Sequence, residues 1–433
     1  MIRRSRNLTL VGTVTNRGDR SRTASRVSTS GRTRRMIRRA VTVDTAELRR
    51  AMVDAVTAEE FLTRWRPAVE PWRASLLTVP RHRFLPATVW VDNDTDPPPG
   101  LMPLQREQDP DRWLELAYAT GYVITQVDDG HPTGPGAGGS MPSSSASGPI
   151  IVAVMLAALD AHEGHRVLEI GTGTGYNAAL LAHRLGAEQV TSVEVDPDIA
   201  THAKAALSDT GFGAVTVITG DGTHGYPTGA PFDRVIATAT VNHVPYAWVA
   251  QTRPGGRILL PWADTYTGGL LALTVDGDGT ATGSIVAESN FMWLREQRDT
   301  RGAIKPTSVG SRDPDRTDAG TTTTCHPHNV TGPHGARVAI GQRVPGCQWR
   351  YYPWEPTDPI GVLWLVDPWG SWAKLTHTTP NADQDDFPVL QSGPRRLWDE
   401  VEAAYRWWVD AGSPDADRWQ FTITPTGQEV QLK

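Results

Sequence analysis

Three glycines alternate within Val167–Tyr176, which reads Val-Leu-Glu-Ile-Gly-Thr-Gly-Thr-Gly-Tyr. An apolar run that ends in alternating glycines and continues into Asn177–Ala182 predicts a buried strand, a tight turn and the start of a helix. Glycine lets a ligand approach the backbone closely because it has no side chain. The spacing alone is weak evidence, since dinucleotides, phosphates and plain turns all use it. The residues that follow therefore decide what chemistry this turn could serve.

Acidic residues follow the next two apolar runs along the chain. Val190–Val193 precedes Glu194, and Val215–Ile218 precedes Asp221 in a Gly-Asp-Gly triplet. A carboxylate at the end of the strand after a glycine turn can accept both ribose hydroxyls of a nucleoside. No lysine of the phosphate-binding kind follows the glycines. This series of strand ends resembles that of class I S-adenosylmethionine (SAM) methyltransferases rather than dehydrogenases or P-loop proteins.

Further apolar runs predict the elements that would position these residues. Phe232–Thr238 and the run that ends at Pro261 read as two more strands of the same parallel sheet. Leu270–Val275 and Gly283–Ala287 predict a hairpin. An amphipathic pattern over residues 44–73 predicts one or two helices ahead of the core. We therefore expect an α/β fold with a Rossmann-like doubly wound sheet, followed by a smaller α+β domain.

Length and charge divide the chain. Its 433 residues suggest two or three domains, and the formal net charge is -6. Residues 1–43 contain twelve Arg and one Asp with no sustained apolar period, so we expect a disordered basic tail. The rest of the chain is acidic. We expect a methyltransferase domain over 44–297, a Thr-, Asp- and Gly-rich linker over 298–333, and a domain over 334–433 that holds nine of the sixteen tryptophans.

The cysteines and the apolar runs bear on compartment and metal binding. Two cysteines in a chain of this size suggest a reducing compartment and no disulfide framework, so we expect a cytoplasmic protein. No apolar run reaches the ~18 residues that a membrane span requires. Cys325-His326-Pro327-His328, with His334 and Cys347, superficially suggests zinc, but zinc sites show tighter paired spacing. We expect no metal.

Several ordered motifs match one methyltransferase family. They are Val79–Pro86, Ser147-Gly148-Pro149 before an apolar helix, the glycine turn, Gly220-Asp221-Gly222, Ala237-Thr238-Ala239 and Gln251–Arg257. Together they resemble the protein-L-isoaspartate O-methyltransferase family over about residues 75–262. Two features depart from that family: Ser143–Ala146 replaces its usual Gln-Thr-Ile, and a Gly/Pro/Ser-rich insertion spans Gly130–Ser147.

The resemblance implies roles for individual residues. The methionine part of SAM would be lined by Glu169, Gly171, Thr172, Gly173 and Gly175. Glu194 would hold the ribose, and Asp221 with Gly222 the adenine. Ser147 would be the catalytic-site residue between cofactor and substrate carboxylate. The substrate backbone would be bracketed by Pro80, Arg81, His82, Phe84, Thr238 and Ala239. An alternative for Phe84 is that its side chain only fills space in the hydrophobic core.

Other polar and aromatic residues could have structural roles instead of functional ones. Asp128-Asp129 is expected to be a solvated loop, and His131 and His243 surface residues, while His82 is left open between site and surface. The tryptophans after residue 334 could fill a small core. Trp and Tyr are also frequent binding anchors, so some of the cluster that includes Tyr351–Trp354 could hold a peptide.

The implied chemistry needs few catalytic groups. An aspartyl carboxylate has an ordinary pKa of about 3.9, so at pH 7 it is already a nucleophile and needs no general base. The long form with its Trp-rich domain resembles the branch that works on lanthipeptides, lasso peptides and graspetides, in which an Asp ester leads to aspartimide and isoaspartate. We expect a monomer with SAM as cofactor and an aspartate-containing peptide as substrate, and no nucleic acid or membrane partner. Repair of isoaspartate in damaged proteins and a non-catalytic SAM-fold peptide-binding module remain alternatives.

Overall fold

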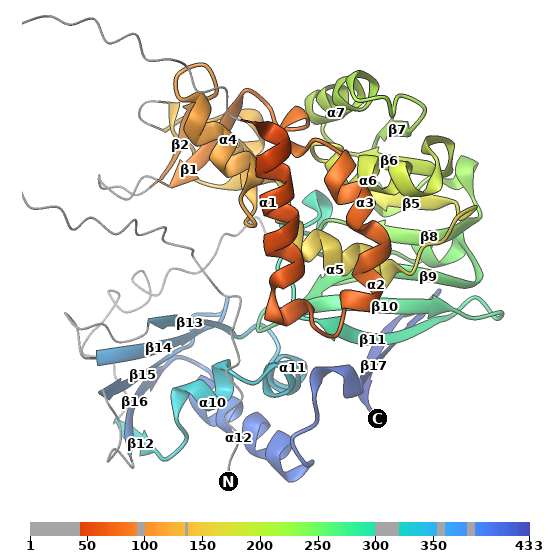
Figure 1. Cartoon of the computed structure of the whole chain (residues 1–433). Coiled ribbons are helices and arrows are strands. Elements are labelled where there is room, and N and C mark those ends of the chain that lie inside the picture. Colours follow the sequence, from red (N-terminus) through yellow and green to blue (C-terminus); the bar gives the residue numbers. More distant parts are fainter. Residues whose placement is uncertain (1–43, 93–99, 135–136, 299–319, 353–359, 379–385) are drawn as a thin grey trace, which may run out of the picture.

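A computed structural model describes residues 44–92, 100–134, 137–298, 320–352, 360–378 and 386–433 (Figure 1). The basic tail expected over residues 1–43 lies outside the described residues, as does most of the expected linker, residues 299–319. Among the described residues, none of the helices combines the length and the apolar character that a bilayer span demands.

Nine strands form the central sheet, in the order β18-β17-β11-β10-β9-β8-β5-β6-β7. Five neighbouring strands are parallel, as expected from the apolar runs. They are β7 (Thr216–Thr219), β6 (Val190–Glu194), β5 (Val167–Ile170), β8 (Phe232–Ala237) and β9 (Thr252–Ala263). Parallel strands that are buried on both faces read as continuous apolar runs, which is why these segments were visible in the sequence.

Two hydrophobic cores cover the two faces of the parallel strands. Alternate residues point to opposite faces, so Val167 belongs to one core and Leu168 to the other. The first core includes α5 (Pro149–Leu159), α6 (Tyr176–Leu185) and α7 (Pro197–Asp209), and the second includes α8 (Tyr246–Ala250). The expected α/β class with a doubly wound sheet is confirmed.

An antiparallel extension continues this sheet beyond β9. The expected hairpin is confirmed as β10 (Gly268–Val275) and β11 (Ala281–Ala287). The next two strands are β17 (Trp419–Thr424) and β18 (Gly427–Leu432), and β17 pairs with β11. The expectation that 334–433 forms a separate domain is therefore wrong for its last residues, because the chain returns to complete the central sheet.

A second sheet is inserted between β11 and β17. Its order is β12-β16-β15-β14-β13, and all its pairs are antiparallel. The strands are β12 (Thr321–Thr323), β13 (Gln348–Tyr352), β14 (Ile360–Val366), β15 (Trp372–Thr378) and β16 (Phe387–Ser392). The helices are α10 (Pro327–Thr331), α11 (His334–Arg343) and α12 (Leu397–Asp410). Residues 321–331, expected as linker, thus contain a strand and a helix of this unit.

Burial divides the tryptophans of this segment. Trp398, Trp408 and Trp419 are buried, so the simple core explanation holds for them. Trp369 is 61% exposed in the turn between β14 and β15. Of the Tyr351–Trp354 cluster, the two tyrosines belong to β13, whereas residues 353 and 354 lie outside the described ranges.

A third, four-stranded sheet lies in the N-terminal part, and the sequence patterns did not predict it. Its order is β2-β1-β3-β4, with β1 (Thr88–Asp92), β2 (Leu101–Gln105), β3 (Val123–Val127) and β4 (Pro142–Ala146). It is accompanied by helices α1 (Thr45–Ala58), α2 (Arg66–Val69), α3 (Arg73–Thr78) and α4 (Pro110–Tyr118). Strand β4 leads directly into α5 of the central unit.

The return of β17 can be tested at Phe421. Its side chain is fully buried and packs edge-on against Trp262 of β9, with ring centroids 4.8 Å apart. We expect Phe421→Ala to lower the free energy of unfolding by about 3–5 kcal/mol, because it leaves a cavity in the core of the central sheet. Urea unfolding followed by circular dichroism measures this. Val409→Ala, at an exposed position of α12, is the control, with an expected change within about 0.5 kcal/mol. Equal effects of the two substitutions would contradict the assignment of β17 to this core.

Candidate functional site

The glycine turn adopts backbone conformations that favour glycine. Gly171, Gly173 and Gly175 have φ values of 90°, 51° and 85°. A Cβ on Gly171 would lie 2.8 Å from Oγ1 of Thr238. That hydroxyl donates to the Gly171 carbonyl at 2.6 Å. Thr238, assigned by resemblance to the substrate side, therefore also fixes the glycine turn.

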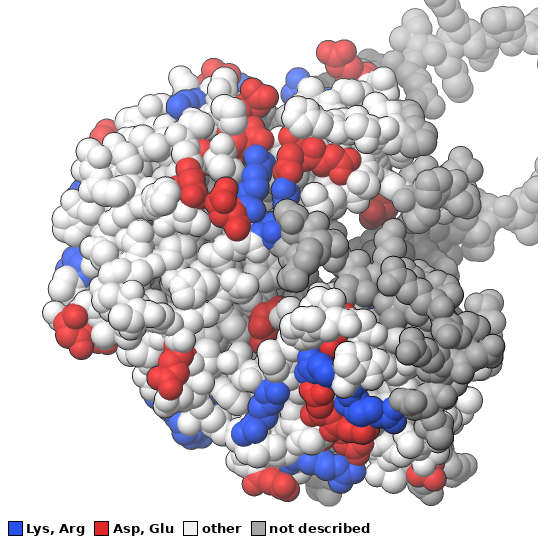
Figure 2. Space-filling view, turned by 180° about the vertical axis from the view of Figure 1, so that it is seen from behind, with Lys and Arg blue, Asp and Glu red and all other residues white. Residues whose placement is uncertain are grey.

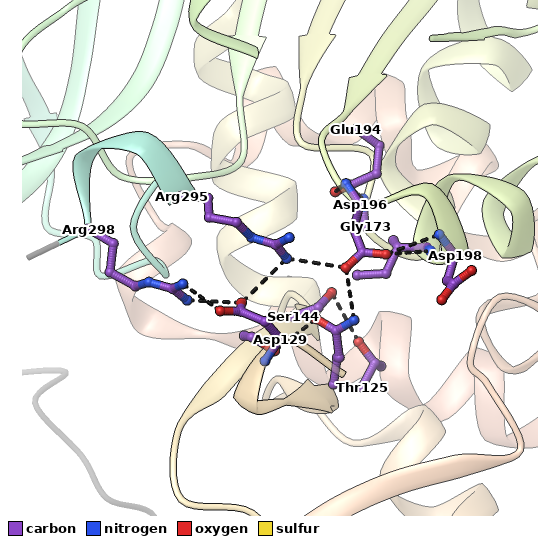
Figure 3. Close-up of polar contacts among 12 residues, drawn as sticks. Thr125, Asp129, Ser144, Gly173, Glu194, Asp196, Asp198, Arg295 and Arg298 are labelled. Atoms are coloured by element: carbon purple, nitrogen blue, oxygen red, sulfur yellow. Dashed lines mark hydrogen bonds and ion pairs between the residues drawn. The ribbon is translucent and has the colours of Figure 1, made fainter. Parts of the chain in front are cut away.

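Glu194 lies at the carboxyl end of β6, beside the glycine turn. Its Oε2 accepts from the Gly173 N–H at 2.9 Å, and its Oε1 accepts from the Asp196 N–H at 3.1 Å (Figure 3). Burial raises the pKa of this carboxyl, while the two N–H groups oppose the rise. Each carboxylate oxygen has two lone pairs, so each keeps one for a ligand. These two free acceptor positions fit a ribose diol, whose two hydroxyl groups can donate to them.

Asp221 and Gly222 lie at the same edge, after β7. Asp221 accepts from the Thr223 N–H at 2.8 Å and from the Thr223 hydroxyl at 2.6 Å. Gly222 is buried, and a Cβ there would lie 2.6 Å from Cγ2 of Ile170. Its carbonyl accepts from the Trp248 indole at 2.8 Å. Gly222 is thus required by close packing, and Asp221 stays partly exposed as a possible acceptor.

Glu169 lies in β5, directly before the glycine turn. Its side chain is fully buried and accepts from Asn177 Nδ2 at 2.7 Å and from Ser192 Oγ at 2.5 Å. Ser192 also shares a hydrogen bond of 2.6 Å with Thr172. Burial raises the pKa of Glu169 to about 7. Glu169 and Thr172 thus form a hydrogen-bonded group with Ser192 beside the glycine turn, and their expected place along the methionine part of SAM stays a prediction.

Arg81 is fully buried, which corrects its expected contact with substrate. Its guanidinium donates to the carbonyls of Ala117 at 2.6 Å, Ala146 at 3.2 Å and Ser147 at 3.1 Å. Burial lowers its pKa to about 10. Arg81 therefore ties the end of α4 to the segment that joins β4 and α5, and it fixes the backbone of Ser147.

The rest of the Val79–Pro86 motif is mainly structural. Phe84 is fully buried and packs edge-on against Tyr176, with ring centroids 5.8 Å apart, so the alternative that it fills space in the core is confirmed. His82 is half-buried, and its Nδ1 lies 2.5 Å from the Tyr118 hydroxyl. Burial and then nearby arginines lower the pKa of His82. Pro80 remains half-buried, as do Ala239 and Ser147.

A group of ion pairs lies beside this site and was not predicted from the sequence. Asp129, expected to be solvated, pairs with Arg298 at 2.6 Å and with Arg295 at 3.5 Å. Arg295 also pairs with Asp196 at 3.3 Å. Asp128 closes its own loop by accepting from the Ser140 and Met141 N–H groups at 2.9 Å. Two arginines three residues apart after the predicted hairpin, Arg295 and Arg298, were the only available signal.

Charge on the surface is mixed on one face of the molecule. Basic side chains stand directly beside acidic ones in two groups there (Figure 2). Within the ranges that the structure describes, no cluster of three or more His, Cys, Asp or Glu is arranged to hold a metal ion. Cys325 and Cys347 are buried, and burial raises their pKa values to about 11 and about 12.

Glu169 predicts a specific pH dependence of stability. Its pKa of about 7 in the folded chain exceeds the ordinary 4.5, so the folded state is favoured below pH 4.5 and loses this contribution as pH rises through 7. We expect Glu169→Gln to gain up to about 3 kcal/mol relative to the parent chain between pH 4.5 and pH 8. Urea unfolding across this range measures the difference. Glu163→Gln reports the effect of an exposed carboxylate, and a pH profile shared by both variants would contradict the prediction.

Glu194 predicts an effect on SAM affinity. A glutamine there keeps the shape but loses charge and one acceptor oxygen, and hydrogen bonds to charged groups contribute about 1.5–3 kcal/mol. We expect Glu194→Gln to weaken SAM binding by roughly 10- to 100-fold in calorimetric titration. Glu188→Gln, at an exposed position before β6, should leave the affinity unchanged. Equal affinities for all three chains would remove Glu194 from the site.

Comparisons with known proteins match the central part of the chain. A profile of the family described as protein-L-isoaspartate(D-aspartate) O-methyltransferase (PCMT) matches residues 138–299. The protein-L-isoaspartate O-methyltransferase of Ignicoccus hospitalis is 42% identical over 116 residues, which cover 27% of this chain and 55% of that protein. A solved structure of a protein-L-isoaspartate O-methyltransferase aligns with 89% of this chain and 99% of its own, at a TM-score of 0.47 and 17% identity.

Coverage of the relatives differs. The chain spans a little over half the length of several of them, 55–60% in three cases. The enzyme of that name from Anaeromyxobacter dehalogenans strain 2CP-1 is 41% identical over 150 residues, which cover 34% of this chain and 71% of that protein. On this similarity, the chain belongs to the protein-L-isoaspartate O-methyltransferase family.

Proposed function

We propose that the chain is a SAM-dependent O-methyltransferase that esterifies the free carboxylate of an isoaspartyl residue in a polypeptide. The observation that carries the proposal is the position of Glu194 against Gly173 at the carboxyl edge of the parallel strands. Ligands of open α/β sheets bind at this edge. Strand β4 passes close to the glycine turn. A Cβ placed on Gly173 would lie 3.7 Å from the Ser145 carbonyl of β4. Ser147, two residues further along the chain, would then lie at the edge of the nucleoside site.

The chain's own residues would bind and orient rather than transfer protons. SAM, when bound, supplies a methyl group on a positively charged sulfur. Glu194 would hold the ribose, and the glycine turn would leave room for the amino-acid part. Ser147, whose backbone Arg81 fixes, would orient the substrate carboxylate. Holding two reactants in line can lower the barrier by roughly 7–11 kcal/mol, so no general base is required.

The product ester sets up a second step that needs no further enzyme group. Transfer forms a carbon–oxygen bond and breaks the carbon–sulfur bond, which leaves a neutral methyl ester. The backbone nitrogen of the following residue can then attack the ester carbonyl, lose its proton and expel methoxide, which leaves as methanol. Hydrolysis of the resulting succinimide gives a mixture of aspartyl and isoaspartyl residues.

A second candidate is esterification of a normal Asp in a ribosomally made peptide. One feature favours it: the sheet β12–β16 lies wholly outside the segment that matches the family profile, residues 138–299. Trp369 is exposed there, and tryptophan is a frequent anchor for bound peptides. The names of the relatives support the isoaspartyl substrate, so this candidate is second.

Matched peptides separate the candidates. Two peptides of one sequence, one with isoaspartate and one with aspartate at the same position, are incubated with the chain and SAM. We expect the isoaspartyl peptide to gain the mass of one methyl group, or to form the succinimide, at least tenfold faster, as measured by mass spectrometry. Glu194→Gln controls for background methylation.

The other outcomes are informative. Faster reaction of the aspartyl peptide would favour the peptide-maturation candidate. SAM binding without methylation of either peptide would favour the non-catalytic binding module.

A further inference from the structure

Strands β3 and β4 cover the glycine turn. We use "the hairpin" for the antiparallel pair β3 and β4 together with the short helical turn Asp128–Gly130 that follows β3. The Ser145 carbonyl of β4 lies 3.7 Å from the position that a Cβ on Gly173 would take. Gln126 of β3 donates to Asp196 Oδ2 at 3.1 Å, two residues beyond Glu194. The hairpin therefore lies over the edge at which we place the nucleoside.

Ion pairs hold the turn of the hairpin to a different part of the chain (Figure 3). Arg298 donates to both oxygens of Asp129, at 2.6 and 3.1 Å. Arg295 lies between Asp129 and Asp196, 3.5 and 3.3 Å from their carboxylates. A guanidinium that donates two hydrogen bonds to one carboxylate fixes the relative orientation of the two groups as well as the distance between them. We call Asp129, Asp196, Arg295 and Arg298 the latch.

The latch side chains are only partly accessible to solvent. Their exposed fractions lie between 9% and 32%. The Arg298 hydrogen bonds lower the pKa of Asp129, and those bonds raise the pKa of Arg298. Both groups are charged at neutral pH. Because these side chains keep some contact with solvent, salt still screens the pairs in part, and we expect the latch to weaken as the NaCl concentration rises.

The arginine side of the latch is fixed to the central sheet. The Thr240 N–H donates to the Met292 carbonyl at 2.7 Å, and the Leu294 N–H donates to the Thr240 carbonyl at 2.8 Å. Gln297 Oε1 accepts from the Asn242 and His243 N–H groups at 3.0 and 3.1 Å. The segment that carries Arg295 is thereby anchored beyond β8. If the latch opens, the turn Asp128–Gly130 is the part that would move, because β3 stays paired with β1 and Arg81 holds the end of β4.

We propose that the latch holds the hairpin over Glu194 and the glycine turn, and that nucleoside enters and leaves only when the latch opens. Asp129, Arg295 and Arg298 are then positioning residues: they act through the hairpin and through Asp196, whose N–H donates to Glu194. This inference rests on the proposed function, because it takes the nucleoside site from there. A brace with a purely structural role would change stability and leave the exchange rates of the nucleoside alone.

Exchange kinetics test the proposal on the full chain. The probe is S-adenosylhomocysteine, and stopped-flow tryptophan fluorescence measures its association and dissociation at low and at high NaCl. We expect Asp129→Asn to speed both rates by about tenfold and to remove most of their salt dependence. Arg298→Gln should do the same, which guards against a folding defect of the first variant. Asp198→Asn is the matched control, because its exposed carboxylate takes no part in the latch.

Each other result has a definite meaning. If both variants bind S-adenosylhomocysteine with the rates of the parent chain, the latch is wrong and the proposed function stands. If only the dissociation rate rises, Asp129 contributes to affinity and the gating role is wrong. If the parent chain binds no S-adenosylhomocysteine, the proposed function fails and the latch fails with it.

Discussion

The hydrogen bond from the Gly173 N–H to Glu194 is the interaction on which the site depends. It joins the ends of two neighbouring parallel strands, whose register pairs Ile170 with Val193. The bond requires a left-handed backbone at Gly173 and a buried carboxylate at the tip of β6. A buried carboxylate is unfavourable without partners, because burial penalises its charge, and the Gly173 N–H supplies one such partner. The carboxylate oxygens keep free lone pairs, which could accept hydrogen bonds from a ligand with hydroxyl groups.

Two fully buried residues near this bond, Arg81 and Glu169, share one design: each is held by backbone groups or neutral side chains rather than by an opposite charge. Arg81 is surrounded by carbonyls, and Glu169 by an amide and a hydroxyl. A buried charge without a charged partner costs free energy, and the shifted pKa values of both groups show that cost. What the chain gains is fixed geometry. Arg81 fixes the backbone of Ser147. Glu169 fixes the side chains of Asn177 and Ser192 beside the glycine turn.

The sequence predicted those parts of the fold that depend on local pattern. Parallel strands and the glycine turn have strong local signals, and the α/β class followed from them. It did not predict that Phe421 returns to the central sheet, because the pairing of β17 with β11 crosses about 130 residues of chain. Nor did it predict that Arg81 is buried or that Asp129 meets Arg298. Charged residues are mostly exposed, and only the tertiary fold reveals the exceptions.

The way in which the second sheet is inserted limits how its role can be studied. Helix α11 contributes Ala336 and Val338 to the core of the central sheet and Ile340 to the core of the second sheet. Gly341 lies so close to Asp264, at the end of β9, that a Cβ would come within 2.1 Å of the carboxylate. Truncation before α11 would strip β17 and β18 from the central sheet as well. It would therefore confuse loss of folding with loss of recognition, whereas a substitution at exposed Trp369 leaves both cores intact and tests recognition alone.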